Sequence, residues 1–491
     1  MRRICLPVLL LAFIAPAFGQ GTGSVAAPQP QAPLTDFAGV YAYRDGQTVA
    51  IVPKNSELIA ILDGALYKLS RVGGDEFRNG AGQAVTFVRN ERGEVLGVKE
   101  VADYFPRQTR AVPPDIAALL IPRDTRTPYR YQVPARLGDG LEVGPAADAG
   151  LSVAMLEELV HSIVSEQYPN VHGVLLWRGG RLVLEEYFYG YNRDREHQMR
   201  SATKSFFSAL VGIAIDLGKI RDDKQPIAEL LPWPSSSYAN PDPRKAKITV
   251  GDLLSMRTGL ACDDRDESSP GNEQRIYSKP DWGRFTIDLP MVAEPGTVAR
   301  YCSGGVHLAG RMIETATGED LLTFARTKLL DPLGFQGYKW PYQPVAANAS
   351  TFGQLYLRPR DMLKFGLLYL NGGRWQGRQL ISQGWIERST APLTQIGSKP
   401  YGYFWWHQTF PITAAGSTQR VDTILATGNG GQKIFIVPSL QLIAVFTGGN
   451  YNSEKDTPPN EIMGNVILPE LLKQHAKEVG AAIQSARPAR P

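Results

Sequence analysis

The chain has 491 residues, and its 43% hydrophobic and 20% charged residues are ordinary for a globular protein. This length exceeds what one hydrophobic core usually serves, so two or more folded units are expected. A net charge of +4 over such a length, without a long basic run, gives no reason to expect nucleic acid as a partner.

The N-terminus has the pattern of a secretory signal. Arg2 and Arg3 form a basic start, residues 4–18 are mostly apolar, and residues 17–19 follow the small-x-small cleavage pattern. The sequence therefore predicts a signal peptide over residues 1–20 and a secreted or periplasmic protein. The apolar run is short and contains prolines, so we expect no stable membrane span after its removal, with an uncleaved anchor as the alternative.

Five short β-type runs lie between residues 35 and 108, separated by turn pairs such as Asp45-Gly46 and Asn79-Gly80. They predict a small all-β domain, either a sheet or a barrel, without a catalytic constellation. A proline-rich tether, residues 21–34, comes before this domain. A connector rich in proline and arginine, residues 109–147, follows it.

Residues 148–475 alternate between helical and strand patterns, and a polar tail over 476–491 ends the chain. Hydrophobic spacing and turn signals predict an α+β domain with an antiparallel sheet, flanking helices and a helical region between. The expected helices cover residues 153–164, 201–217, 249–259, 306–315, 359–370 and 460–472, and the expected strands cover 171–177, 181–188, 433–437 and 442–447.

Ser201 and Lys204 occur at the start of the apolar helix over 201–217. Residues three apart share a helix face, so the two side chains should meet. The backbone N–H of Ser201 is one of the unpaired donors of the helix N-terminus and could hold an oxyanion. A lysine buried there loses solvation, which disfavours its charged form and suits it to accept the serine proton. A capping serine with a surface lysine is the alternative.

Removal of the signal leaves Cys262 and Cys302 as the only cysteines. An even pair in an oxidising compartment suggests a disulfide, although two separate buried thiols would fit the same sequence.

Several segments together resemble the serine β-lactamase and penicillin-binding-protein superfamily, in particular its class C-like serine hydrolases, which include family esterases and nylon-oligomer hydrolases. Ser201-Ala202-Thr203-Lys204 is similar to the family's Ser-x-x-Lys motif. The resemblance extends from about residue 150 to 470. Its other segments are residues 248–260, 294–303, 331–335, 360–373 and 428–432.

The resemblance implies a β-lactamase-like fold and a role for each matching residue. Ser201 would be the nucleophile, and Lys204 and Tyr301 would carry the proton to the leaving group. Ser303 would be an accessory hydrogen-bonding group. The backbone N–H groups of Ser201 and Gln432 would form the oxyanion hole, on a substrate-binding strand that comprises Asn429, Gly430, Gly431 and Gln432. The family motifs beside Cys262 and Cys302 meet at one cleft, which implies a disulfide beside the active site.

The sequence therefore predicts a secreted serine hydrolase that cleaves an ester or amide bond of a small molecule through an acyl-enzyme. It lacks the Gly-x-Ser-x-Gly elbow that marks one kind of Ser/His/Asp hydrolase. It also lacks a His-Glu-x-x-His motif, and its six histidines show no clustered metal-ligand spacing, so we expect neither metal nor cofactor. The alternatives are a true β-lactamase or D-Ala peptidase, and a non-catalytic binding or sensor protein on the same scaffold. No oligomeric state is indicated.

The substrate class depends on charge near Ser201. Many relatives have lysine or histidine where this chain has Asn429, and a cation there would favour the carboxylate of a penicillin or a D-Ala peptide. The sequence favours short-chain esters or neutral amides, unless Lys433, Arg257 or Arg300 supplies the missing charge.

Overall fold

The computed structural model describes residues 32–474, except 44–45, 63, 81, 101–102, 124–127, 278, 343–353, 415 and 453–456. The predicted signal peptide, the polar tail and most of the tether lie outside the described residues. Among the helices within these ranges, none is both long and apolar enough to cross a lipid bilayer.

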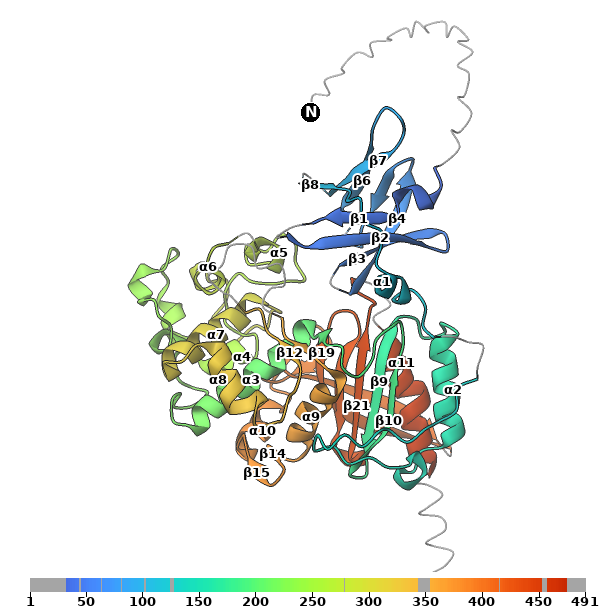
Figure 1. The fold of residues 1–491 in the computed structure, drawn as a ribbon. Helices are drawn as coiled ribbons and strands as arrows, with labels where there is room; N and C mark the ends of the chain where they lie inside the picture. The colour runs from blue at the N-terminus through green and yellow to red at the C-terminus, as the bar shows by residue number, and fades with distance from the viewer. Residues whose placement is uncertain are drawn as a thin grey trace, which may run out of the picture.

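The N-terminal strands form a closed eight-stranded meander (Figure 1). Each strand pairs antiparallel with the next, and a bridge between Tyr41 and Arg107 brings the last strand beside the first. The all-β prediction is confirmed, and of its two forms the structure has the barrel. The strands are β1 (Gly39–Ala42), β2 (Thr48–Lys54), β3 (Glu57–Leu62), β4 (Ala65–Gly73), β5 (Glu76–Arg78), β6 (Ala84–Arg89), β7 (Val95–Glu100) and β8 (Asp103–Pro106).

Alternating side chains divide the barrel residues between two apolar clusters. Val49 and Ile51 of β2 belong to the cluster inside the barrel. Their neighbours Ala50 and Val52 point outward and pack with residues on and around the short helix α1 (Pro114–Ala118). The connector is thereby attached to the outer face of the barrel.

The second part of the chain is built on an eight-stranded antiparallel sheet with the order β10-β9-β21-β20-β19-β18-β17-β16. The predicted hairpin is present as β9 and β10, and the two predicted late strands as β20 and β21. The long pair β18 and β19 was not predicted. The bounds are β9 (Val171–Arg178), β10 (Arg181–Tyr187), β16 (Thr394–Ile396), β17 (Lys399–Tyr401), β18 (Trp406–Ala414), β19 (Ser417–Gly428), β20 (Gln432–Val437) and β21 (Leu442–Gly448).

Helices cover both faces of this sheet (Figure 1). On one face lie α2 (Val153–Val164) and α11 (Pro458–Ile462), which continues through a π-helical turn, η10 (Met463–Ile467). On the other face lie α3 (Thr203–Asp216), α9 (Pro359–Leu370) and α10 (Gln383–Ser389). The observed bounds of α2 and α9 match the prediction.

A helical region adjoins α3 and lies on the left in Figure 1. Its helices are α4 (Val250–Leu254), α5 (Glu273–Ile276), α6 (Trp282–Asp288), α7 (Gly304–Thr317) and α8 (Leu321–Ala325). The predicted helix over 249–259 is shorter than expected. Thr249 and Asp252 form a capping box at its start, but Met256 has a φ of +63° and turns the chain away. The predicted α+β fold with a helical subdomain is confirmed.

The remaining elements are short. Three small strands form a separate sheet, β11 (His197–Gln198), β12 (Tyr338–Lys339) and β13 (Tyr356–Leu357), and a hairpin joins β14 (Arg374–Trp375) to β15 (Arg378–Gln379). Short 3-10 and π turns are η1 (Leu34–Phe37), η3 (Ala146–Ala149), η4 (Arg200–Ala202), η5 (Ile227–Glu229), η6 (Ser235–Ser237), η7 (Pro243–Lys247), η8 (Arg326–Leu330) and η9 (Pro438–Leu440).

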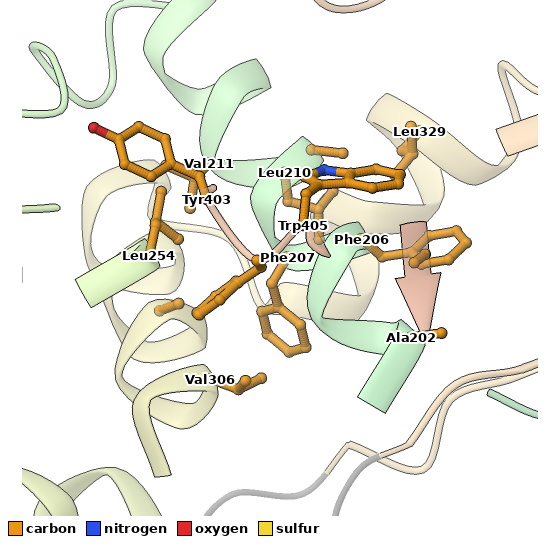
Figure 2. Packing of buried hydrophobic residues seen from close by; sticks show 14 of the residues in the cluster. Ala202, Phe206, Phe207, Leu210, Val211, Leu254, Val306, Leu329, Tyr403 and Trp405 are labelled. Atoms are coloured by element: carbon orange, nitrogen blue, oxygen red, sulfur yellow. The ribbon is translucent and has the colours of Figure 1, made fainter. Parts of the chain in front are cut away.

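Helix α3 lies at the centre of the largest core, and its residues are buried from Thr203 to Ala214. Figure 2 shows Phe206, Phe207 and Leu210 packed among side chains of neighbouring segments, including Trp405. The Phe206 ring stacks on Phe365 of α9 with 3.7 Å between ring centroids. A helix packed on all sides cannot shift without opening the core, so its first turn is a rigid platform for a site.

Arg360 connects α9 to the sheet through a buried ion-pair cluster. Its guanidinium donates to Glu185 of β10 at 2.6 and 2.9 Å and to Asp139 of the connector at 3.1 Å. All three side chains are at most 4% exposed. Removing one member would leave the other charges buried without a partner.

We predict that Arg360→Met lowers the free energy of unfolding by about 3–5 kcal/mol, because two carboxylates stay buried and uncompensated. Urea denaturation measures this loss. The matched control is Arg326→Met. Arg326 forms an ion pair with Asp331, and the two side chains are 52% and 51% exposed. The control variant should cost less than about 1 kcal/mol. Equal costs for the two variants would contradict the role given to Arg360.

Candidate active site

Ser201 lies in the 3-10 turn η4, directly before α3, as the sequence predicted. Lys204, one turn further, is 4% exposed, and its Nζ donates a hydrogen bond to Ser201 Oγ at 3.0 Å. The preceding residue, Arg200, has a φ of +50°, which is uncommon for a side chain other than glycine. Such strain is typical of functional sites, where surrounding structure holds the backbone in place.

Lys204 also contacts the segment that carries Tyr301 and Ser303. Its Nζ donates to Ser303 Oγ at 3.1 Å and lies 4.9 Å from the centroid of the Tyr301 ring. The structure thus brings together the four residues that the family motifs predicted. Lys204 stands between the two serines and the aromatic ring.

The segment around Tyr301 is held by a disulfide and a carboxylate. Cys262 and Cys302 are bonded, with 5.3 Å between their Cα atoms, which confirms the predicted pairing. Two residues after Cys262, Asp264 donates its backbone N–H to Tyr301 O and accepts the Ser303 N–H at its Oδ2, both at 2.7 Å. Asp264 belongs to no motif identified in the sequence, and its position two residues after Cys262 was the signal that could have pointed to it.

Asp264 is a buried carboxyl group close to the site, and its two oxygens accept the backbone N–H groups of Ser303 and Glu273. Burial, reinforced by the charge of Glu273, raises the pKa of the Asp264 carboxyl to about 6, while the charge of Lys204 opposes the rise. Its protonation state therefore changes close to neutral pH.

The predicted substrate-binding segment over residues 428–432, called the third motif below, approaches the nucleophile Ser201 closely. A Cβ on Gly428, the last residue of β19, would lie 2.2 Å from Met199 O and 2.9 Å from Arg200 Cβ, so only glycine fits there. Gly430 and Gly431 have φ values of +95° and +100° and form the turn into β20. Both β19 and β20 contact η4, so the start of β20 faces the Ser201 turn.

The side chains of Asn429 and Gln432 are held by their neighbours. Gln432 exchanges two hydrogen bonds with the backbone of Gly448, at 2.7 and 3.1 Å, and its side chain points toward β21. Asn429 Nδ2 donates to Asn452 Oδ1 at 2.6 Å and its Oδ1 accepts the Asn452 N–H at 3.0 Å. These bonds fix the backbone of the third motif, and the oxyanion role of the Gln432 N–H stays a prediction.

A cleft of about 320 Å³ lies in front of Ser201, and Tyr301 and Asn429 line it too. Lys204 and Ser303 lie behind it and line a separate cavity of about 10 Å³, the size of a single water. His307 also lines this inner cavity, and burial followed by the charge of Lys204 lowers the pKa of His307 to about 3. A neutral imidazole is thus the neighbour of the lysine.

The cleft carries more positive charge than the sequence suggested. Lys433 of β20 lines it and donates to Thr427 Oγ1, and Arg265 and Lys399 line it as well. Neither Arg257 nor Arg300 lines it. Of the three cations that the sequence left open as replacements for the charge missing at Asn429, Lys433 is the one that lines the cleft, and the expected preference for neutral substrates stays a prediction.

No group of three His, Cys, Asp or Glu side chains suited to a metal ion occurs in the part of the chain that the structure describes.

The antiparallel sheet, the buried central helix and the serine–lysine pair at its N-terminus together define a β-lactamase-like protein. The family described as Beta-lactamase matches residues 158–462, well over half of the sequence. The chain belongs to this family, whose members are serine hydrolases.

Two curated relatives each match less than half of the chain. The chain is 27% identical over 238 residues to the 6-aminohexanoate-dimer hydrolase of Paenarthrobacter ureafaciens, covering 43% of this chain and 55% of that one. It is 29% identical over 216 residues to penicillin-binding protein 4 of Amycolatopsis lactamdurans, covering 43% and 53%. The matches span about half the length of these curated relatives.

Among solved structures, a family VIII carboxylesterase matches with a TM-score of 0.51 at 17% identity, covering 64% of this chain and 96% of that one. At this identity the likeness concerns the fold.

We predict that Asp264→Asn increases the free energy of unfolding, relative to the natural protein, more at pH 7 than at pH 4. The pKa of Asp264 is raised from 3.8 to about 6 in the folded protein, so the folded state binds the proton more tightly. Stability from this group is therefore present at low pH and lost as pH rises through about 6. Asparagine cannot ionise. The difference in free energy of unfolding between the variant and the natural protein should therefore grow by on the order of 2 kcal/mol from pH 4 to pH 7.

Urea denaturation at several pH values between 4 and 7 measures this difference. The control is Asp266→Asn, because a hydrogen bond from Ser268 lowers the pKa of the Asp266 carboxyl below that range. Its difference from the natural protein should stay nearly constant. A pH-independent difference for Asp264→Asn would show that the carboxylate is ionised without cost.

Proposed function

We propose that the protein is a secreted serine hydrolase that cleaves an ester or amide bond through an acyl-enzyme on Ser201. The observation that carries the proposal is the contact of the buried Lys204 amine with Ser201 Oγ at 3.0 Å. A serine hydroxyl is a poor nucleophile at neutral pH and needs an adjacent base. Lys204 is the basic group in contact with it.

In the acylation step, the Lys204 amine accepts the hydroxyl proton as Ser201 Oγ attacks the substrate carbonyl. The Oγ–carbon bond forms and the bond to the leaving alcohol or amine breaks. Tyr301, in contact with Lys204, passes the proton to the leaving group. The backbone N–H groups of Ser201 and Gln432 stabilise the oxyanion. Water then attacks the acyl-enzyme, loses its proton by the same route, and releases the acid and free Ser201.

Ser303 is proposed to hold the lysine in place. It accepts a hydrogen bond from Lys204, and its own position is fixed by Asp264 through the backbone N–H and by the neighbouring disulfide. A fixed amine is aimed at Ser201 Oγ without reorganisation during the reaction.

The location and domain limits are part of the proposal. The signal-like N-terminus, together with a disulfide, supports secretion or export to the periplasm. We also propose that residues 35–108 and 148–475 are separate domains, joined by the connector over 109–147.

The nucleophile is tested with a fluorophosphonate probe, which reacts with activated serines. We expect a single adduct on Ser201, mapped by mass spectrometry, and no adduct in Ser201→Ala. Ser208→Ala, a buried serine of the same helix, is the matched control and should label normally. An adduct elsewhere would contradict the assignment. Labelling of Ser201 without turnover of any chromogenic ester would support the non-catalytic alternative instead.

A second candidate function is hydrolysis of β-lactams or D-Ala peptides, and Lys433 is the observation that favours it. A lysine in the cleft can pair with the carboxylate that these substrates carry near the scissile bond. Short-chain esters lack this carboxylate. The two functions therefore differ in their dependence on Lys433.

We predict that Lys433→Met lowers kcat/KM for a penicillin at least about tenfold, the loss of one charge-assisted hydrogen bond. Hydrolysis of p-nitrophenyl acetate should change less than threefold, because this ester carries no charge for Lys433 to bind. Lys399→Met, an exposed lysine of the same cleft, is the control and should change both less than threefold. Equal losses for both substrates in Lys433→Met would show a structural role for Lys433.

A further inference from the structure

The N-terminal barrel encloses a cavity that the serine–lysine site does not explain. The cavity measures about 310 Å³. Small eight-stranded barrels are either filled by their own side chains or hold one small ligand. Here the two cases occur in one barrel. Phe37, Phe77 and Phe87 pack together at 4.6–5.4 Å between ring centroids and fill one part, and the cavity occupies another.

The larger part of the wall of this cavity is apolar. Its side chains come from several strands of the barrel and include Val49, Ile51, Leu69, Val85, Val98 and Phe105. All six side chains are buried and belong to the interior cluster of the barrel. A wall of this kind favours an uncharged, apolar ligand.

A carboxylate with its own partners defines the polar part of the cavity. Glu100 accepts hydrogen bonds from Tyr43 Oη at 2.8 Å and from Asn79 Nδ2 at 3.0 Å. The negative charge would repel an anionic head group. The cavity therefore suits a neutral chain or ring more than a fatty acid anion.

The cavity reaches the hydrolase part of the chain. Gln274, Tyr277 and Asn452, which lie outside the barrel strands, complete its lining. Asn452 is the residue that clamps Asn429 of the active-site cleft. A Cβ on Gly80 of the barrel would lie 3.4 Å from Asn452 Cβ, so the barrel sits directly on this clamp.

A second contact links the cavity to the nucleophile. Tyr67 lines the cavity, and its hydroxyl accepts a hydrogen bond from Arg200 Nη2 at 2.5 Å. Arg200 is the residue before Ser201. The Tyr67 ring also stacks on Tyr451, with 5.7 Å between centroids. One arginine side chain therefore separates the backbone of the nucleophile from the cavity wall.

We propose that the barrel cavity binds an uncharged apolar chain of the substrate whose ester or amide bond is cleaved at Ser201. This inference rests on the proposed hydrolase function and deepens it. The barrel selects the substrate by burying its apolar part, and the scissile bond is cleaved at Ser201 in the active-site cleft. Binding energy from this remote part would serve to position the scissile bond.

The test compares p-nitrophenyl octanoate with p-nitrophenyl acetate in the full chain. Val98→Trp fills the cavity and should lower kcat/KM for the octanoate at least tenfold, while the acetate changes less than twofold. The control is Leu96→Trp on the same strand, whose side chain is 47% exposed, and which should leave both esters within twofold. An unchanged octanoate rate, or equal losses for both esters, would overturn the proposal.

Direct binding is measured with the apolar dye N-phenyl-1-naphthylamine on the Ser201→Ala protein, in which catalysis plays no part. We expect saturable fluorescence that methyl octanoate displaces. Val98→Trp, or the milder Ala60→Leu at another residue that lines the cavity, should weaken dye binding at least fivefold. Dye binding unaffected by both variants would overturn the cavity as the site. Dye binding without turnover of either ester by the natural protein would overturn the hydrolase function, and with it the assignment of the ligand as a substrate.

Discussion

The hydrogen bonds of the Lys204 amine join the two parts of the candidate site. One reaches Ser201 Oγ at the start of α3, and the other reaches Ser303 Oγ on the segment before α7. A buried amine needs partners for its protons, and a lysine without them would be costly at 4% exposure. The position of the nucleophile therefore depends on everything that holds these two segments in contact with Lys204.

Three features of the fold provide that support. The burial of α3 on all sides fixes the lysine, and the Cys262–Cys302 bond with Asp264 fixes the Ser303 segment. Gly428 lets the β19–β20 turn approach the Ser201 turn more closely than any larger residue would allow. The site is thus assembled from segments far apart in the sequence, while the chemistry needs only a few of their atoms.

Sequence patterns predicted the elements whose local signals agree with their environment. The helix over 359–370 has a proline at its first position and an apolar stripe, and both limits match α9. Ser201 and Lys204 were found because one helical turn joins them, and Tyr301 and Ser303 because the family resemblance placed them. Cys262 and Cys302 were paired by count and by position beside those motifs.

The missed features depend on tertiary contacts. The first residues of β19 are exposed, so the strand has no apolar alternation there, and β5 spans only three residues. Asp264 acts through a backbone N–H of a segment 39 residues away, and Lys433 turns toward the cleft because of the sheet register. The barrel closes around its cavity through pairing between its first and last strands, which lie far apart in the sequence. None of these contacts leaves a periodic signal.

Lys204 and Tyr301 are proposed to form one proton-transfer unit that serves Ser201. A double-mutant cycle on kcat/KM for p-nitrophenyl acetate tests it most directly, with Lys204→Met, Tyr301→Phe and the double variant. Each single change should lower kcat/KM by about 10²–10⁴. The kcat/KM of the double variant should be close to that of the less active single variant, because either change alone already disables the unit. If the two losses multiply instead, the residues act independently and the account is contradicted.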